Sequence, residues 1–153
     1  MTLWVGVRSK LKLRGVHPDL RAVMAHAIAN STNGEFVVVC GLRSLARQRE
    51  LYASGASKTM NSRHLTGHAV DLAPIIGGKL TWSSPAFHPL ASSIKFSAHE
   101  LEVAMEWGGD FNNHGTTGSR WVDLPHYQLP RGIYHDDDMS SHSFKAAAYL
   151  RGL

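Results

Sequence analysis

The chain has 153 residues and a formal net charge of +4 at pH 7, with 43% hydrophobic and 18% charged residues. This composition is that of an ordinary soluble globular protein, and the length suits a single domain over residues 1–153. No run approaches the roughly 20 apolar residues of a membrane span, and residues 1–6 lack the apolar core of a signal peptide. The single cysteine, Cys40, excludes an internal disulfide, and its apolar surroundings predict a buried, unreactive thiol.

Basic residues alternate with leucines near the start of the chain, at Arg8, Lys10, Lys12 and Arg14. Together with a pI near 9.5, this alternation indicates a basic stripe on the surface. Such a stripe suits nucleic acid, but no nucleic-acid-binding motif accompanies it. A modest positive charge attracts any anionic polymer equally well, so we expect no nucleic-acid partner.

The first half of the chain predicts two helices around a strand. Pro18 opens a helical pattern that ends between residues 30 and 34, because proline is favoured in the first helical turn. The apolar run at 36–40 predicts a buried strand. Ser44 suits the N-cap of a helix that ends near residue 54.

The second half continues the mixture of helices and strands. A tight hairpin turn is predicted at residues 76–79, where two adjacent glycines lead into an extended segment at 80–82. The longest helical pattern covers residues 89–107. The remaining predicted elements are a strand at 69–73, a strand at 126–129 and a short helix at 144–150. This order of elements predicts an α+β domain.

Residues 62–72 read SRHLTGHAVDL and contain two candidate metal ligands, His64 and Asp71. An uninterrupted strand would place residues seven apart on opposite faces, so the chain must turn between them. Gly67 is the natural place, because glycine tolerates the backbone angles of a turn. An aspartate inside an apolar strand is costly to bury unless it is paired or binds a metal.

A second cluster, DLPHYQL, covers residues 123–129. Pro125 disfavours helical geometry before it, so a strand is predicted to start at His126, with His126 and Gln128 on one face. Asp123 precedes this strand, in a loop that can lean over a metal. With His64 and Asp71, His126 completes the three N and O ligands of a catalytic zinc site, and Asp123 adds a general base.

These segments resemble a known family. SRHLTGHAVDL is similar to the Ser-x-His-x-x-Gly-x-Ala-x-Asp signature of the zinc D,D-peptidase/LAS superfamily, and DLPHYQL is similar to its downstream Asp/Glu-x-x-His element. The upstream segment that begins GLRSLARQRELYAS and the later EWGGDF resemble more narrowly the phage L-alanyl-D-glutamate peptidase endolysins, a VanY-like branch. The resemblance runs from about Val16 to Leu129, which is most of the chain.

The resemblance implies a role for each candidate residue. His64, Asp71 and His126 would bind one Zn²⁺, Asp123 would be the catalytic base, and Arg43 would meet the developing oxyanion. Several relatives carry glutamate where this chain has Asp123. The implied fold is α+β, with a small central antiparallel sheet flanked by helices. The implied reaction is zinc-dependent hydrolysis of the L-alanyl-D-glutamate bond in the peptidoglycan stem peptide.

The resemblance also sets the biological expectations. The protein would be made in the host cytoplasm without a signal peptide, reach the cell wall through a phage holin, and act there as a monomer without a separate wall-binding domain. Ser62 and Trp107 are candidate substrate-binding residues. Trp107 and Trp121 either line a substrate groove or fill the core.

Two alternative metal sites remain open. His64 and His68 have the i, i+4 spacing of a helical metal pair, although Gly67 disfavours a helix there and no glutamate follows His64. The acidic run Asp136, Asp137 and Asp138 is either a calcium site or a solvated loop.

Two alternative functions also remain. A D,D-carboxypeptidase acting on D-Ala-D-Ala termini would use the same zinc ligands and base. A zinc-binding module that only binds the wall would share the ligands but would not need Asp123, so this carboxylate separates an enzyme from a binding module.

Overall fold

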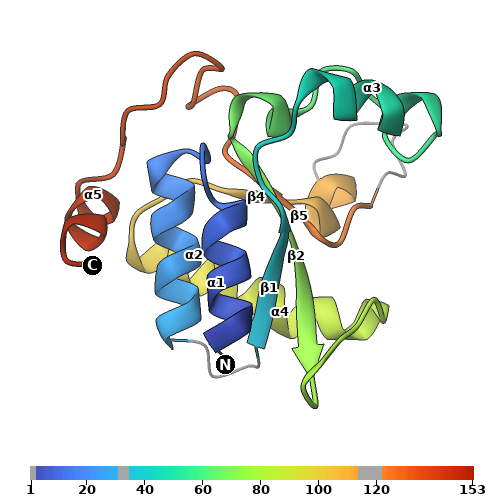
Figure 1. The fold of residues 1–153 in the computed structure, drawn as a ribbon. Helices are drawn as coiled ribbons and strands as arrows, with labels where there is room; N and C mark the ends of the chain where they lie inside the picture. Colours follow the sequence, from blue (N-terminus) through green and yellow to red (C-terminus); the bar gives the residue numbers. More distant parts are fainter. Residues whose placement is uncertain (1–2, 31–34, 114–121) are drawn as a thin grey trace.

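The structure is a computed structural model that describes residues 3–30, 35–113 and 122–153, which contain five α-helices and five β-strands (Figure 1). The helices are α1 (Leu3–Lys12), α2 (Pro18–Asn30), α3 (Leu45–Ala53), α4 (Phe87–Glu100) and α5 (Phe144–Arg151). The strands are β1 (Glu35–Cys40), β2 (Ala69–Ile76), β3 (Lys79–Leu80), β4 (Glu106–Trp107) and β5 (His126–Gln128). Short 3-10 turns are η1 (Arg63–Thr66), η2 (Ser84–Ala86) and η3 (Gly108–Asn113).

The strands form one antiparallel sheet in the order β1-β2-β5-β4, with β3 folded back on β2 as a hairpin. Helix α1 packs on β1, while α4 contacts both β2 and α2 and crosses behind the strands in the view of Figure 1. The arrangement confirms the expected α+β class with a small antiparallel sheet. Because β5 pairs with β2, two segments far apart in the sequence lie side by side.

The hydrophobic core lies between the sheet, α2 and α4. Along α2, apolar residues recur every three or four positions and are at most 1% exposed, as expected for one buried helix face: Leu20, Val23, Met24 and Ala27. They belong to one cluster with apolar side chains of β1, β2 and α4: Phe36, Val38, Val70, Leu72 and Ile94. This core fixes β1 and β2. The end of β1 and the start of β2 lie at the candidate site.

Several predicted boundaries are confirmed. Helix α2 starts at Pro18, and Ser44 caps α3 by accepting a hydrogen bond from the backbone N–H of Arg47 at 3.1 Å. Gly77 and Gly78, both with positive φ, make the turn between β2 and β3. The predicted helix near the end of the chain is α5.

The prediction of one helix over residues 89–107 is wrong at both ends. Helix α4 starts at Phe87 and stops at Glu100, after which Glu102 adopts a φ of +53°. Buried apolar residues continue beyond the helix, so the periodic pattern does not reveal where it ends. Trp107 consequently lies in β4 rather than in a helix.

The basic segment near the start forms helix α1, which the alternating pattern did not predict. Residues two apart lie roughly 200° apart around a helix, so Lys10 and Lys12 point to different sides and do not form a single stripe. Within the described part of the chain, no helix is both long enough and apolar enough to cross a membrane.

A buried carboxylate attaches the segment after β5 to the start of α2. Asp19 is 0% exposed and accepts hydrogen bonds from the Tyr134 hydroxyl at 2.9 Å, from the backbone N–H of His142 at 2.9 Å and from the Ser141 hydroxyl. Each donor offsets part of the cost of burying the charge. The segment that leads to α5 is therefore held against the body of the domain.

We expect Gly67→Ala to destabilise the fold strongly. Gly67 has a φ of +78°, and a Cβ there would lie 2.3 Å from the Gly15 carbonyl oxygen. The left-handed conformation costs a residue with a Cβ about 1–2 kcal/mol, and the clash adds about 1–3 kcal/mol. The measurement is the free energy of unfolding in urea. Gly55→Ala is the matched control, since Gly55 has a φ of +79° but open space around it; equal losses in the two variants would contradict the steric argument.

Candidate metal and catalytic site

His64 is positioned by a short capped turn. The Ser62 hydroxyl accepts a hydrogen bond from the backbone N–H of His64, and Gly67 ends η1 in the left-handed conformation. The chain therefore turns where the glycine was predicted to turn it, between His64 and the strand that carries Asp71. The His64 side chain is 2% exposed and points toward Asp71.

Asp71 and His126 meet because β2 and β5 pair in register at these two residues. Directly opposite residues of an antiparallel pair project from the same face of the sheet. His126 Nδ1 lies 3.2 Å from Asp71 Oδ1, and His64 Nε2 lies 3.2 Å from the same oxygen. The structure thus brings together all three residues that the sequence predicts as zinc ligands.

Each imidazole ring has a second partner, which contacts the ring nitrogen that faces away from Asp71. His64 Nδ1 lies 2.8 Å from the Gly41 carbonyl oxygen, which can only accept, so Nδ1 carries the hydrogen. His126 Nε2 lies 2.8 Å from Gln128 Oε1, and Glu106 fixes that amide by accepting from its Nε2 at 2.8 Å. Partners of this kind set the tautomer of metal-binding histidines and leave the inner nitrogen able to bind a cation.

The donor set fits a metal ion. His64 Nε2 is buried and makes no hydrogen bond to any described residue, although it faces Asp71. Two groups of side chains could hold an ion, one formed by Cys40, His64 and Asp71 and one formed by Asp71, Asp123 and His126. Neither group contains both histidines, but the two groups share Asp71, which therefore links His64 to His126. Imidazole nitrogens with a carboxylate are typical zinc ligands.

Without a metal, His64 holds a proton. Burial lowers the pKa of His64, but Asp71 and Cys40 outweigh it and raise the pKa to about 9. Burial raises the pKa of Asp71, but the neighbouring His126 and His64 rings outweigh it and hold the pKa well below its ordinary value. A cation bound by His64 would have to displace the proton on this ring, so acid would weaken metal binding.

Asp123 lies in the loop before β5. Its carboxylate lies within 4.8 Å of ligand atoms of Asp71 and His126. Its backbone N–H donates to the Gly108 carbonyl at 3.1 Å, and its own carbonyl accepts from the backbone N–H of His126 at 3.1 Å. Burial raises the pKa of Asp123 above its ordinary value. A carboxylate with a raised pKa beside a metal ligand is suited to accept and return a proton.

Arg43 approaches Asp71 from the end of β1. Its guanidinium lies 3.4 Å from Asp71 Oδ2 and donates to Gln48 Oε1 at 2.7 Å. Gln48 is fully buried and also donates to the Ser57 hydroxyl and the Thr59 carbonyl. Gln48 thereby holds Arg43 in a fixed position relative to the segment that contains Ser57 and Thr59. The role of Gln48 could not be predicted from the sequence, because nothing in the pattern of a mostly exposed helix distinguishes a buried glutamine from a solvated one.

The interpretation of Cys40 as a buried, inert thiol is wrong. The side chain is only half-buried, and Sγ lies 3.8 Å from His64 Nδ1 and 3.5 Å from the Arg43 guanidinium. Burial raises the pKa of the thiol, but His64 and Arg43 outweigh it and lower the pKa. The strand pattern predicted burial correctly for Phe36, Val37 and Val38, but it could not show that β1 ends beside His64 and Asp71.

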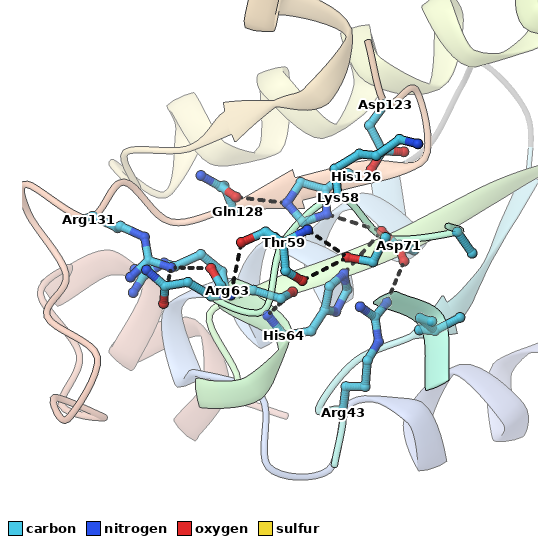
Figure 2. A pocket seen from close by; sticks show the side chains of 15 residues that line it. Arg43, Lys58, Thr59, Arg63, His64, Asp71, Asp123, His126, Gln128 and Arg131 are labelled. Atoms are coloured by element: carbon cyan, nitrogen blue, oxygen red, sulfur yellow. Dashed lines mark hydrogen bonds and ion pairs between the residues drawn. The ribbon is translucent and has the colours of Figure 1, made fainter. Parts of the chain in front are cut away.

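A cleft of about 510 Å³ opens beside these residues. Figure 2 shows the side chains that line it. Its lining includes all five predicted metal-binding and catalytic residues and Ser62. The other lining residues are Leu51, Ala56, Ser57, Lys58, Thr59, Asn61, Arg63, Gln128 and Arg131. The lining has four basic side chains, Arg43, Lys58, Arg63 and Arg131, and two carboxylates, Asp71 and Asp123, so basic groups are in excess and favour an anionic ligand.

Trp107 does not line this cleft, which corrects its prediction as a substrate-binding residue. Its side chain is 7% exposed, stacks on Tyr127 and donates from Nε1 to the Leu124 carbonyl at 2.8 Å. Trp107 therefore belongs to the core and steadies the loop that carries Asp123. Trp121 lies outside the described residues.

The rival pair of His64 and His68 does not converge on one place. His68 Nδ1 lies 2.8 Å from the Thr66 hydroxyl and Nε2 lies 3.0 Å from the Asp138 carbonyl. Both ring nitrogens thus have partners away from His64.

The acidic run near the end of the chain also has other partners. Asp136 pairs with Arg63 at 2.6 Å and with Arg131 at 3.1 Å, and Asp138 pairs with His142 at 2.7 Å. Neither candidate metal group among the described residues includes these carboxylates. The calcium interpretation therefore has no ligand cluster to support it.

We expect Gly108→Ala to disturb the placement of Asp123. A Cβ on Gly108 would lie 2.0 Å from the Asp123 carbonyl oxygen, so the loop would have to move. The free energy of unfolding should fall by about 1–3 kcal/mol, and the NMR signals of the His126 ring should shift. Gly132→Ala is the control, because nothing lies within 4 Å of a Cβ there. An unshifted His126 signal in Gly108→Ala would contradict this account of the loop.

Comparisons with known proteins agree with the geometry. A family model described as phage L-alanyl-D-glutamate peptidase matches residues 1–129. The L-alanyl-D-glutamate peptidase of Escherichia phage T5 is 30% identical over 138 residues, which cover 88% of this chain and 94% of that protein. The enzyme of the same name from Listeria phage A118 is 33% identical over 109 residues, which cover 71% of this chain but 35% of that protein.

A solved structure gives the same result. The crystal structure of the L-Ala D-Glu endopeptidase ChiX from Serratia marcescens matches with a TM-score of 0.72 and 41% identity. The match covers 83% of this chain and 90% of that one. The chain belongs to the phage L-alanyl-D-glutamate peptidase family.

Proposed function

We propose that this protein is a zinc-dependent endolysin that hydrolyses the L-alanyl-D-glutamate bond of the peptidoglycan stem peptide and so lyses the host cell. The observation that carries the proposal is that His64 and His126 both lie 3.2 Å from one oxygen of Asp71, with Asp123 and Arg43 lining the same cleft. Membership of the phage peptidase family supports the same reaction.

His64, Asp71 and His126 would hold the zinc ion. Two imidazole nitrogens and one carboxylate oxygen favour zinc over magnesium or calcium, which prefer all-oxygen sites. A zinc ion bound there supplies Lewis-acid chemistry, which acidifies water and polarises the scissile carbonyl.

Asp123 transfers protons, and Arg43 stabilises the negative charge that develops on the carbonyl oxygen. Asp123 accepts the proton of the attacking water and returns it to the leaving amine of the glutamate residue, for which its raised pKa is suited. Arg43, held by Gln48 beside Asp71, places a positive charge where negative charge develops on the carbonyl oxygen. A well-placed donor of this kind is worth about 3–4 kcal/mol in the transition state.

We further propose that residues 1–153 act as one zinc peptidase domain in a monomer. The enzyme would be synthesised in the host cytoplasm and reach the peptidoglycan once a phage holin has opened the membrane. The excess of basic over acidic residues, +4 in all, favours approach to the anionic wall.

The purified protein should contain about one zinc per chain, and a strong chelator should abolish lysis until zinc is restored. His126→Ala should lose most of the zinc, because it removes one of three ligands. His68→Ala should retain it, since both His68 ring nitrogens have other partners. Elemental analysis of folded protein checks this. Loss of zinc in His68→Ala but not in His126→Ala would overturn the ligand assignment.

Asp123→Asn should keep the fold and the zinc but lower turnover by roughly 10²-fold or more, because the amide cannot accept a proton. Asp137→Asn removes a charge from an exposed position and serves as the control. Mass spectrometry of digested sacculi measures the loss and names the cleaved bond. Near-normal turnover in Asp123→Asn would mean that another group activates the water, and new D-alanine termini would favour a D,D-carboxypeptidase.

A further inference from the structure

Arg131 lies at one end of the cleft, beyond the strand that carries His126. Its guanidinium contacts both oxygens of Asp136 at 3.1 Å and donates to the carbonyl oxygen of Asn61 at 2.8 Å and to the Asn61 side chain at 3.2 Å. In Figure 2 it lies at the opposite end of the lining from Arg43. Partners on two sides hold the guanidinium in a fixed orientation at the cleft.

The charges at this end do not cancel. Asp136 also pairs with Arg63, so a single carboxylate faces two guanidinium groups and the three residues carry a net charge of +1. Arg63 is 3% exposed and is occupied by the carbonyl groups of Leu129 and Tyr134. Arg131, with 41% of its side chain exposed, therefore presents the surplus charge to the cleft.

The proposed substrate carries its charge on one side of the cleaved bond. In an alanyl-glutamate bond, alanine contributes the carbonyl and has a neutral side chain, whereas glutamate contributes the nitrogen and keeps a free carboxylate. The charge of Arg43 at the other end is already opposed by Asp71. The net positive charge at the Arg131 end can accommodate an anionic group.

We propose that Arg131 binds a free carboxylate on the amine side of the scissile bond. This inference rests on the proposed function and adds the direction of the substrate in the cleft: the acidic half lies toward Arg131 and the alanyl half toward Arg43. Arg131 is thus a specificity residue. A guanidinium held in place pairs with a carboxylate at little entropic cost, because its orientation is already fixed.

The competing interpretation is that Arg131 only ties Asn61 to the segment after β5. The two interpretations differ in their dependence on the substrate. A structural tie affects all substrates equally, whereas a carboxylate-binding residue affects only substrates that carry the carboxylate.

The test uses two soluble stem peptides that contain the alanyl-glutamate bond, one with free carboxylates on the amine side and one with these converted to carboxamides. The wild-type enzyme should prefer the acid by about tenfold in kcat/KM, mainly through KM, as expected for one charged hydrogen-bonded pair. Arg131→Gln should reduce this preference to about twofold or less. Arg131→Lys should keep an intermediate preference, because it retains the charge but loses the paired contacts with Asp136 and Asn61 that orient it. Arg151→Gln, which removes an equal charge from α5, should keep the wild-type preference.

An unchanged acid-to-amide ratio in Arg131→Gln would overturn the proposal and leave Arg131 as a structural tie. If the wild-type enzyme cleaves neither peptide, the proposed function fails, and calorimetric binding of the two peptides still decides the role of Arg131. Tighter binding of the acid that Arg131→Gln removes would support the proposal. Equal binding of acid and amide would refute it.

Discussion

The candidate site depends on the partly buried carboxylate of Asp71, which faces one guanidinium group and two imidazole rings. His64, His126 and Arg43 all lie within 3.4 Å of its oxygens. A carboxylate in this position is stable only with such partners, and each of them is costly to bury alone. Asp71 therefore determines where the two histidines must lie, and the backbone is arranged to bring them there.

Three separate backbone features bring these partners together. The η1 turn supplies His64, the register of β2 with β5 supplies His126, and the end of β1 supplies Arg43. Each side chain is also held from outside the site, by Gly41, by Gln128 with Glu106, and by Gln48. Side chains held from both directions lose little freedom when a ligand binds, which is the basis of preorganised catalysis.

Local chemistry explains which features the sequence could predict. Gly67, Ser44 and Pro125 act through the geometry of their own backbone or through neighbours a few residues away, so the turn, the helix cap and the start of β5 followed from short segments. The end of α4 and the surroundings of Cys40 depend on packing between distant segments. The same holds for Trp107, whose aromatic side chain suits a core as well as a groove.

The segment after residue 129 lies beyond the sequence motifs and beyond the match to the family model. The family model ends there, yet the next residues form hydrogen bonds and ion pairs with the turn that carries His64, through Arg63, and with the cleft wall, through Asn61. Asp19 attaches the same segment to α2. Because the turn that carries His64 and the Asn61 end of the cleft share these contacts, the segment after residue 129 holds both of them in place.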